Sequence, residues 1–186
     1  MSASEHGGMS DPTDGDPTDR DPTDGDEAGP TDREYVDRAI ELAEEAVEAG
    51  NTPFGALLVL DGEIVAEEHN ETLTEDDLSA HPELALARWA GRELDVDERA
   101  RCTMYASTEP CPMCATGIHY AGIGRVVFGV AGETLDALTG DVVTIPCAEV
   151  IRRGGGDTEV EGPIAEAAAM TLHESVYGEP SRDRTR

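Results

Sequence analysis

Apolar residues recur at helical spacing shortly after the thirtieth residue of the chain. One apolar stripe with this spacing consists of Val36, Ile40, Ala43 and Val47. The residues Thr31 to Glu34 have the pattern of a capping box, in which two side chains satisfy N–H groups at a helix start. Gly50 is of a residue type that commonly ends helices. The pattern therefore predicts a first helix between these two signals.

A continuous apolar segment and its partner follow, separated by a turn signal. Phe54 to Leu60 predicts a buried strand, and Glu63 to His69 predicts the strand that returns beside it. Asp61-Gly62 between them is a dipeptide typical of two-residue hairpin turns. A polar loop is predicted from Asn70 to Ser79.

Farther along the chain, predicted helices alternate with predicted strands. The helices are His81–Glu93, Pro112–Ala121 and Pro163–Tyr177, and the strands are Thr103–Ser107, Arg125–Val130 and Val142–Ile145. A hairpin followed by this alternation predicts an α/β fold. We expect a three-layer α/β/α sandwich around a central mixed sheet of about five strands.

The N-terminal segment has a repeat that predicts no packed structure. Residues 11–25 read DPTDG, DPTDR, DPTDG. Low hydrophobicity, high charge and a proline in every repeat leave this segment nothing to bury. We predict a disordered acidic tail over residues 1–30, with a spacer role favoured over a docking role. One folded domain is predicted over 31–178, and a frayed C-terminus over 179–186.

The charge of the chain is strongly unbalanced. There are 41 acidic residues against 13 basic ones, a net charge of −28, and no lysine. Most of the acid lies outside the tail, so the tail does not explain the imbalance. Such a charge repels itself at low ionic strength, whereas at about 1 M salt the Debye length is only ~3 Å. The composition resembles that of proteins from salt-accumulating halophiles, and we predict adaptation to high salt.

The sequence has no segment that predicts export or membrane insertion. No apolar run approaches the ~20 residues that a membrane helix needs. The first residues, MSASEHGG, have neither the basic start nor the apolar core of a secretory signal. With four cysteines and no export signal, we expect reduced thiols in the cytoplasm.

The candidate chemistry centres on Cys111 and Cys114 in the segment STEPCPMCATGI. A disulfide is disfavoured in a reduced compartment unless the pair is redox-active. A thioredoxin-like pair stands near the start of a βαβ unit and leaves His81 and Glu83 without a role. A structural zinc site would need a fourth ligand, from Cys102 or Cys147.

A catalytic zinc site needs three protein ligands and an open position. Cys111 and Cys114 lie in the first turn of a predicted helix, where residues three apart can converge and the helix dipole favours thiolates. His81 opens the other helix and would complete the set as a neutral ligand. Glu83, two residues farther on, could then face a water and move protons without binding the metal.

His81-Pro82-Glu83 with Pro110-Cys111-Pro112-Met113-Cys114 has the H-x-E…P-C-x-x-C pattern of zinc deaminases. The chain resembles the cytidine/deoxycytidylate deaminase superfamily, in the branch of guanine deaminases, fungal-type cytosine deaminases and tRNA adenosine deaminases. The likeness covers roughly Val36 to Val130 and includes Pro53-Phe54-Gly55-Ala56, Asn70, Thr108-Glu109-Pro110-Cys111 and Gly124-Arg125-Val126-Val127-Phe128-Gly129. Pro82 departs from the alanine of many relatives, but a proline is tolerated in a first helical turn.

The resemblance implies a hydrolytic deaminase with one zinc ion per chain, held by His81, Cys111 and Cys114. It implies that Glu83 carries protons between the water, the base and the leaving amine, and that ammonia is released. It also implies substrate contacts from Asn70 and Phe54. Asn70 as a plain turn residue and Phe54 as a plain core residue remain the alternatives.

The substrate class is predicted from charge. A tRNA deaminase must hold a polyanion, normally through a basic surface, and this chain is acidic. We therefore predict a small-molecule nucleobase or nucleoside as substrate, with tRNA-specific adenosine deamination as the alternative. A non-catalytic zinc-stabilised binding module is a further alternative, although it would not need Glu83.

The remaining expectations concern assembly and residues outside the motif. By resemblance we expect a homodimer, with apolar segments such as Ile118 to Ile123 as a candidate face. Cys102 and Cys147 are interpreted as small buried residues. No role is assigned to His69, His119 and His173.

Overall fold

The computed structural model describes residues 31–178. The predicted tail over 1–30 and the predicted frayed end over 179–186 lie outside the described residues. No helix among the described residues is long and apolar enough to cross a membrane.

The first helix, α1 (Asp32–Glu48), starts as its sequence predicts. Thr31 is the N-cap, its side chain accepts from the Glu34 N–H, and the Glu34 carboxylate accepts from the Thr31 N–H at 2.7 Å. Gly55 lets this helix approach the first strand, because a Cβ there would lie 2.5 Å from the Ala39 carbonyl oxygen. The capping box and the helix are therefore confirmed.

The predicted mixed sheet is confirmed, with five strands in the order β2-β1-β3-β4-β5. The strands are β1 (Gly55–Leu60), β2 (Glu63–His69), β3 (Thr103–Thr108), β4 (Arg125–Val130) and β5 (Glu159–Glu161). β1 pairs antiparallel with both β2 and β3, whereas β3, β4 and β5 are parallel. The carboxyl ends of β3 and β4 therefore lie side by side at one edge.

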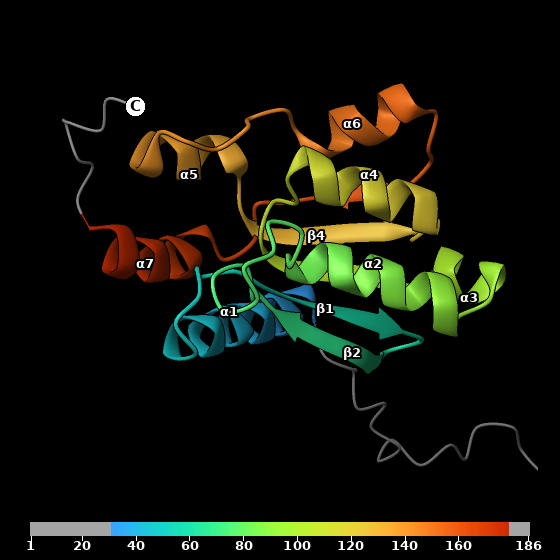
Figure 1. Ribbon diagram of the computed structural model, residues 1–186. Helices are drawn as coiled ribbons and strands as arrows, with labels where there is room; N and C mark the ends of the chain where they lie inside the picture. The colour runs from blue at the N-terminus through green and yellow to red at the C-terminus, as the bar shows by residue number, and fades with distance from the viewer. Residues whose placement is uncertain (1–30, 179–186) are drawn as a thin grey trace, which may run out of the picture.

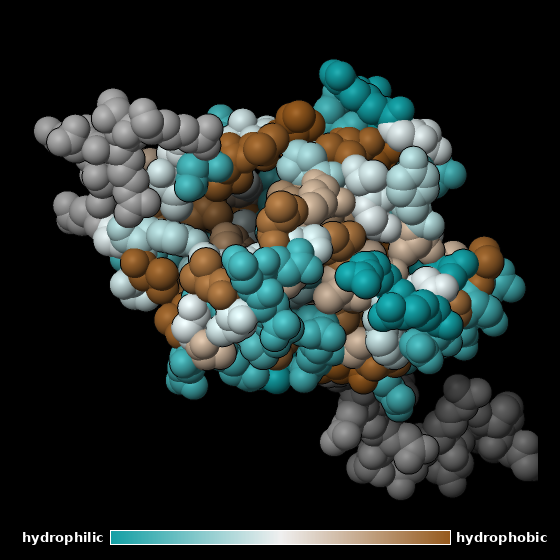
Figure 2. All heavy atoms as spheres, in the orientation of Figure 1, coloured by the Kyte–Doolittle hydropathy of each residue, from teal (hydrophilic) through white to brown (hydrophobic). Residues whose placement is uncertain are grey.

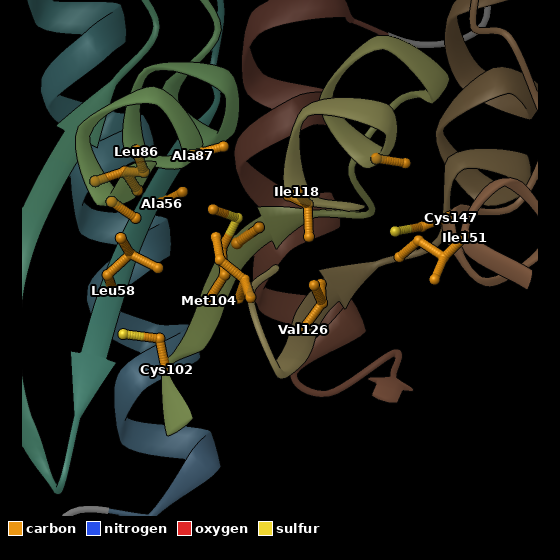
Figure 3. Close-up of a cluster of buried hydrophobic side chains, with 14 residues drawn as sticks. Ala56, Leu58, Leu86, Ala87, Cys102, Met104, Ile118, Val126, Cys147 and Ile151 are labelled. Atoms are coloured by element: carbon orange, nitrogen blue, oxygen red, sulfur yellow. The ribbon is translucent and has the colours of Figure 1, made fainter. Parts of the chain in front are cut away.

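Helices cover both faces of the sheet, which gives the three layers (Figure 1). α2 (Pro82–Glu93), α4 (Pro112–Ala121) and α6 (Cys147–Gly154) pack on one face, and α1 and α7 (Glu166–Tyr177) pack on the other. Alternate strand residues divide between the layers: Leu58, Met104 and Val126 join the first core (Figure 3), and Leu57, Tyr105 and Val127 join the second. This division follows from the two-residue period of a strand.

Two predicted elements need correction. Val142–Ile145 is not a strand but part of the irregular connection after α5 (Gly132–Thr139), and the fifth strand is the short segment Glu159–Glu161. Val143 and Ile145 are exposed, so these apolar side chains are not buried in the sheet as a strand prediction would require. The last helix begins at Glu166, three residues later than predicted.

Three short helices were not predicted: α3 (Val96–Arg101), α5 and α6. α3 has no buried residue, so it carries no apolar stripe that a sequence could display. α5 and α6 have eight residues each, which is too short for a clear period.

The segment from Ile118 to Ile123, a candidate face for the expected dimer, has both of its isoleucines in the core. Both isoleucines are buried in the core, with 0% and 1% of their surface exposed. Tyr120 between them is 83% exposed. The homodimer therefore stays a prediction without this support.

Candidate active site

Two helix N-termini meet near the carboxyl end of β3 and carry the H-x-E and C-x-x-C motif residues. His81 is the N-cap of α2 and Cys111 is the N-cap of α4, and each is followed by a proline at the first helical position. Cys114 lies in the first turn of α4 and is fully buried. The packing of α2 against α4 brings together residues that are about thirty positions apart in the chain.

The three side chains form a group whose ligand atoms all lie within 4.8 Å of one another. The two sulfur atoms are 3.6 Å apart, and His81 Nδ1 lies 3.9 Å from Cys111 Sγ and 3.6 Å from Cys114 Sγ. Ligands placed tetrahedrally around zinc, at ~2.3 Å for sulfur and ~2.0 Å for nitrogen, are about 3.5–3.8 Å apart. The donor set and its spacing therefore fit zinc.

The two thiols have very different proton affinities. The hydrogen bond with Cys114 lowers the pKa of Cys111 to about 4. The same bond, together with burial, raises the pKa of Cys114. The pair therefore shares one proton, which would be released when a metal binds the two sulfurs.

Glu83 lies beside this group without belonging to it. Its side chain is 4% exposed, and Oε2 lies 3.4 Å from Cys114 Sγ. Burial raises the pKa of Glu83 to about 6, because the charged form loses its hydration. A carboxyl group with this pKa can both accept and donate a proton near neutral pH.

The structure also decides among the other interpretations of the cysteines. Cys102 and Cys147 are buried in the hydrophobic core, as predicted, and among the described residues neither joins the His81 group. Within residues 31–178, therefore, no fourth protein ligand joins the group to close a structural zinc site. The open side of the group faces a cavity.

The cavity has a volume of about 450 Å³. Its floor is formed by His81, Glu83 and Cys111. In Figure 2 it is seen as a hollow bordered by apolar side chains, between α5 and the start of α4. Small-molecule sites typically enclose about 300–1,000 Å³, so the volume suits a ligand of modest size.

One side of the cavity is formed by residues 131–147, which comprise α5 and its connection to α6; we call this segment the pocket wall. It contributes Leu135, Thr139, Asp141, Val142 and Val143 to the lining. The sequence analysis assigned no role to these residues, because they belong to no motif and one part was interpreted as a strand. Among the described residues the Asp141 side chain forms no hydrogen bond or ion pair.

The opposite side is aromatic. Phe54 and Tyr177 line the cavity, and the His173 ring lies 5.5 Å from Phe54 and 6.0 Å from Tyr177 between ring centroids. His173 is 1% exposed, and its Nε2 lies 2.9 Å from the hydroxyl of the cavity residue Thr108. Burial lowers the pKa of His173 to about 4, so this histidine is neutral. No sequence signal pointed to this contribution of α7.

The two predicted substrate contacts differ in their placement. Phe54 lines the cavity, as expected for a substrate contact. Asn70 is 1% exposed and is not among the lining residues. Its Oδ1 accepts from the N–H and the hydroxyl of Thr72, and its own N–H donates to the Phe54 carbonyl at 2.9 Å. Asn70 therefore holds a turn next to Phe54.

Comparison with known proteins identifies the family. The family model of the cytidine and deoxycytidylate deaminase zinc-binding region matches residues 30–130, which is more than half of the chain. The chain belongs to this deaminase family. The resemblance inferred from the sequence is thereby confirmed.

Individual relatives are named for different substrates. The chain is 29% identical over 159 residues to a probable cytosine deaminase of Schizosaccharomyces pombe, over 81% of this chain and 95% of the relative. It is 41% identical over 104 residues to a guanine deaminase of Bacillus subtilis, over 55% of this chain and 65% of the relative. A solved structure from a study of A-to-I editing by tRNA:A34 deaminases matches with a TM-score of 0.61 and 26% identity, over 74% of this chain and 97% of that one.

Membership of the family establishes the reaction class and the metal. The cytidine deaminase-family protein is a zinc-dependent deaminase, a hydrolase that acts on C–N bonds. The relatives are named for different bases, so family membership shows the reaction class and the metal but not the base.

Proposed function

We propose that this deaminase acts on a free nucleobase or nucleoside, with His81, Cys111 and Cys114 as zinc ligands and Glu83 as the proton carrier. The observation that carries the proposal is the convergence of three donor atoms at zinc spacing on the floor of a cavity, with a buried carboxyl group beside them. When bound, zinc supplies Lewis-acid activation of water near neutral pH.

Glu83 handles the protons of the reaction. Hydrolysis replaces the C–N bond to the exocyclic amine by a C=O bond and releases ammonia. The Glu83 carboxylate takes one proton from the attacking water and passes it to a ring nitrogen, and it then carries the proton of the added hydroxyl to the leaving amine, so that the C=O bond forms as ammonia leaves. The raised pKa of Glu83, caused by burial, suits both directions of transfer.

The cavity offers complementary contacts for a planar base. Phe54 provides an aromatic surface for the ring. Asn70 lies outside the cavity lining, and its oxygen accepts from Thr72, so it supports this contact by holding the turn beside Phe54. Asp141 provides an acceptor for a ring or amino N–H on the opposite side.

Charge supports a small neutral substrate over RNA. The chain has a net charge of −28, and carboxylates of Glu109 and Asp141 line the cavity itself. Phosphate groups would be repelled by these carboxylates, and nucleic-acid binding normally relies on Lys and Arg contacts. The cytosine and guanine deaminases among the relatives are named for free bases, which also supports this choice.

A substrate panel tests the proposal. Purified protein in high salt is incubated with guanine, cytosine, adenine, their nucleosides, and a tRNA that carries adenosine in its anticodon loop, and ammonia is measured. We expect ammonia from at least one free base or nucleoside and none from the tRNA. Formation of inosine in the tRNA, without turnover of any small substrate, would instead establish the tRNA-deaminase alternative.

We also propose that the protein is adapted to high salt. Its cations are shared among several acids: Arg38 pairs with Glu41, Glu45 and Glu67. With 41 acidic residues against 13 basic ones, most carboxylates have no cation of their own. The dominant surface interaction is then repulsion, which salt screens.

The expected result is a melting temperature that rises by more than about 5 °C between ~0.1 M and ~2 M KCl, as screening adds roughly 1–2 kcal/mol. Sucrose at matched osmolality is the control, because it favours compact states by exclusion without screening charge. A melting temperature that is insensitive to KCl, or that rises equally with sucrose, would contradict the adaptation.

We propose a deaminase domain over residues 31–178, flanked by the segments 1–30 and 179–186, and a homodimer as the functional unit. The description of residues 31–178 as one sheet with helices on both faces supports the first part.

A further inference from the structure

Glu109 lines the cavity close to Glu83, and its position two residues before Cys111 invites the interpretation that it is a second catalytic acid. Its hydrogen bonds favour a different role. One carboxylate oxygen, Oε2, accepts from the Gly132 N–H at 3.0 Å, and the other, Oε1, accepts from the Cys147 N–H at 2.9 Å. Each oxygen therefore binds the backbone of a separate segment.

The two N–H groups belong to two helix starts. Gly132 is the first residue of α5 and Cys147 is the first residue of α6. Their N-caps, Ala131 and Pro146, provide no capping side chain. A carboxylate at a helix N-terminus is stabilised by the unsatisfied N–H groups and the helix dipole, and here one carboxylate serves two helices.

The two helix starts are also the two ends of the pocket wall, residues 131–147. The wall provides Leu135, Thr139 and Asp141 to the cavity, together with the irregular segment that follows. The backbone of Glu109 is itself fixed, because its N–H donates to the Val130 carbonyl at 2.8 Å. Glu109 thus connects the loop before the metal group to both ends of a wall that lies beyond the residues matched by the family model.

We infer that Glu109 is a positioning residue that fixes the pocket wall against the loop before Cys111 and thereby sets the affinity for the substrate. It acts through the wall and does not touch the reacting atoms. The inference rests on the proposed function for its kinetic readout only, since the fixation of the wall can be measured without a substrate.

The first test is Glu109→Gln, with Glu133→Gln as the matched control. Glu133 is an exposed glutamate in the first turn of the same α5, and its side chain forms no hydrogen bond that fixes the wall. The amide of a glutamine would present an NH₂ group to one of the two backbone donors. We expect amide hydrogen exchange to accelerate at least about tenfold in Glu109→Gln at whichever of residues 132 and 147 faces the NH₂ group, and to stay unchanged at both in Glu133→Gln.

The kinetic expectation for Glu109→Gln separates positioning from catalysis and from folding. The KM for the substrate found in the panel should rise about tenfold or more, while kcat changes by less than about threefold and the zinc content is retained. A residue with a merely structural role would lower the melting temperature without this split between KM and kcat.

A second pair of variants removes the bond from the other side and leaves Glu109 intact. Gly132→Pro deletes the N–H that donates to Glu109 and puts the ring Cδ in the place of its hydrogen, so the Glu109 carboxylate must move away; proline itself is tolerated at a first helical position. Ala131, with φ −70° and ψ 145°, already has the backbone conformation that a following proline requires. Gly132→Ala is the control, because it keeps the N–H and its Cβ would meet neighbouring atoms only at 3.6 Å or more.

Gly132→Pro should raise KM as Glu109→Gln does, and Gly132→Ala should not. Unchanged exchange at residues 132 and 147 in Glu109→Gln would overturn the inference, and so would an unchanged KM in both Glu109→Gln and Gly132→Pro. Loss of zinc in Glu109→Gln would also overturn it, since Glu109 would then support the metal ligands. If the native protein turned over no substrate, the proposed function would fail, and the exchange measurement alone would still decide the role of Glu109.

Discussion

Glu83→Gln is expected to retain about one zinc ion per chain and to lose at least ~10²-fold in turnover, the scale of general acid–base catalysis. The substitution preserves the size of the side chain and removes its acid group. Glu83 is buried beside Cys114 but lies outside the group of three ligand atoms, so the metal does not depend on its charge. Glu109, a second carboxyl group that lines the cavity, has both oxygens engaged by backbone N–H groups.

The measurement combines zinc by mass spectrometry with ammonia release on the same samples. Glu93→Gln, an exposed glutamate at the other end of α2, is the matched control and should behave as the native protein. Normal turnover of Glu83→Gln would show that the catalytic assignment is wrong. Loss of zinc from Glu83→Gln would show that this residue is a ligand or a support of the metal site.

Cys114→Ala is expected to lose zinc and activity together. The substitution removes one of three donors, and Cys114 is the one that approaches both partners to 3.6 Å. Two remaining protein ligands bind zinc much more weakly, because each ligand contributes to the affinity and water replaces the third only poorly. Cys102→Ala is the control: this cysteine is equally buried but lies in the hydrophobic core at the start of β3.

Cys102→Ala should keep its zinc and its turnover and should lose only some stability, as expected for a small deletion in a packed core. Zinc content by mass spectrometry and ammonia release are compared between the two variants after folding has been checked by circular dichroism. Retention of stoichiometric zinc by Cys114→Ala would contradict the proposed ligand set. Equal loss of zinc in both variants would indicate that the effect comes from the fold and not from the ligand.

Local patterns in the sequence predicted the elements whose chemistry is local. The capping box at Thr31 and the stripe from Val36 to Val47 predicted α1, because both signals span a few helical turns. The hairpin around Asp61-Gly62 was predicted for the same reason, since its residues are adjacent in the chain. The candidate zinc ligands were found because Cys111 and Cys114 lie within one turn, and His81 precedes Glu83 by two residues.

Only the tertiary structure decided how these local pieces combine. His81 and Cys111 are thirty positions apart in the chain, and the packing of α2 on α4 brings their side chains together. No local sequence pattern predicts how two separate helices pack. The pocket wall was mispredicted in part because Val142–Ile145 is apolar without a neighbouring strand, and its apolar side chains instead border the cavity or solvent. Tyr177 lines the cavity, and His173 contacts the lining residues Phe54 and Thr108, although α7 packs on the face of the sheet opposite α2 and α4. Periodicity and motif spacing predict the secondary structure and the local contacts of a residue within its own segment. The partners of Glu109 and His173, and the position of Asp141 in the cavity lining, depend on how distant segments pack, and that is a property of the folded chain alone.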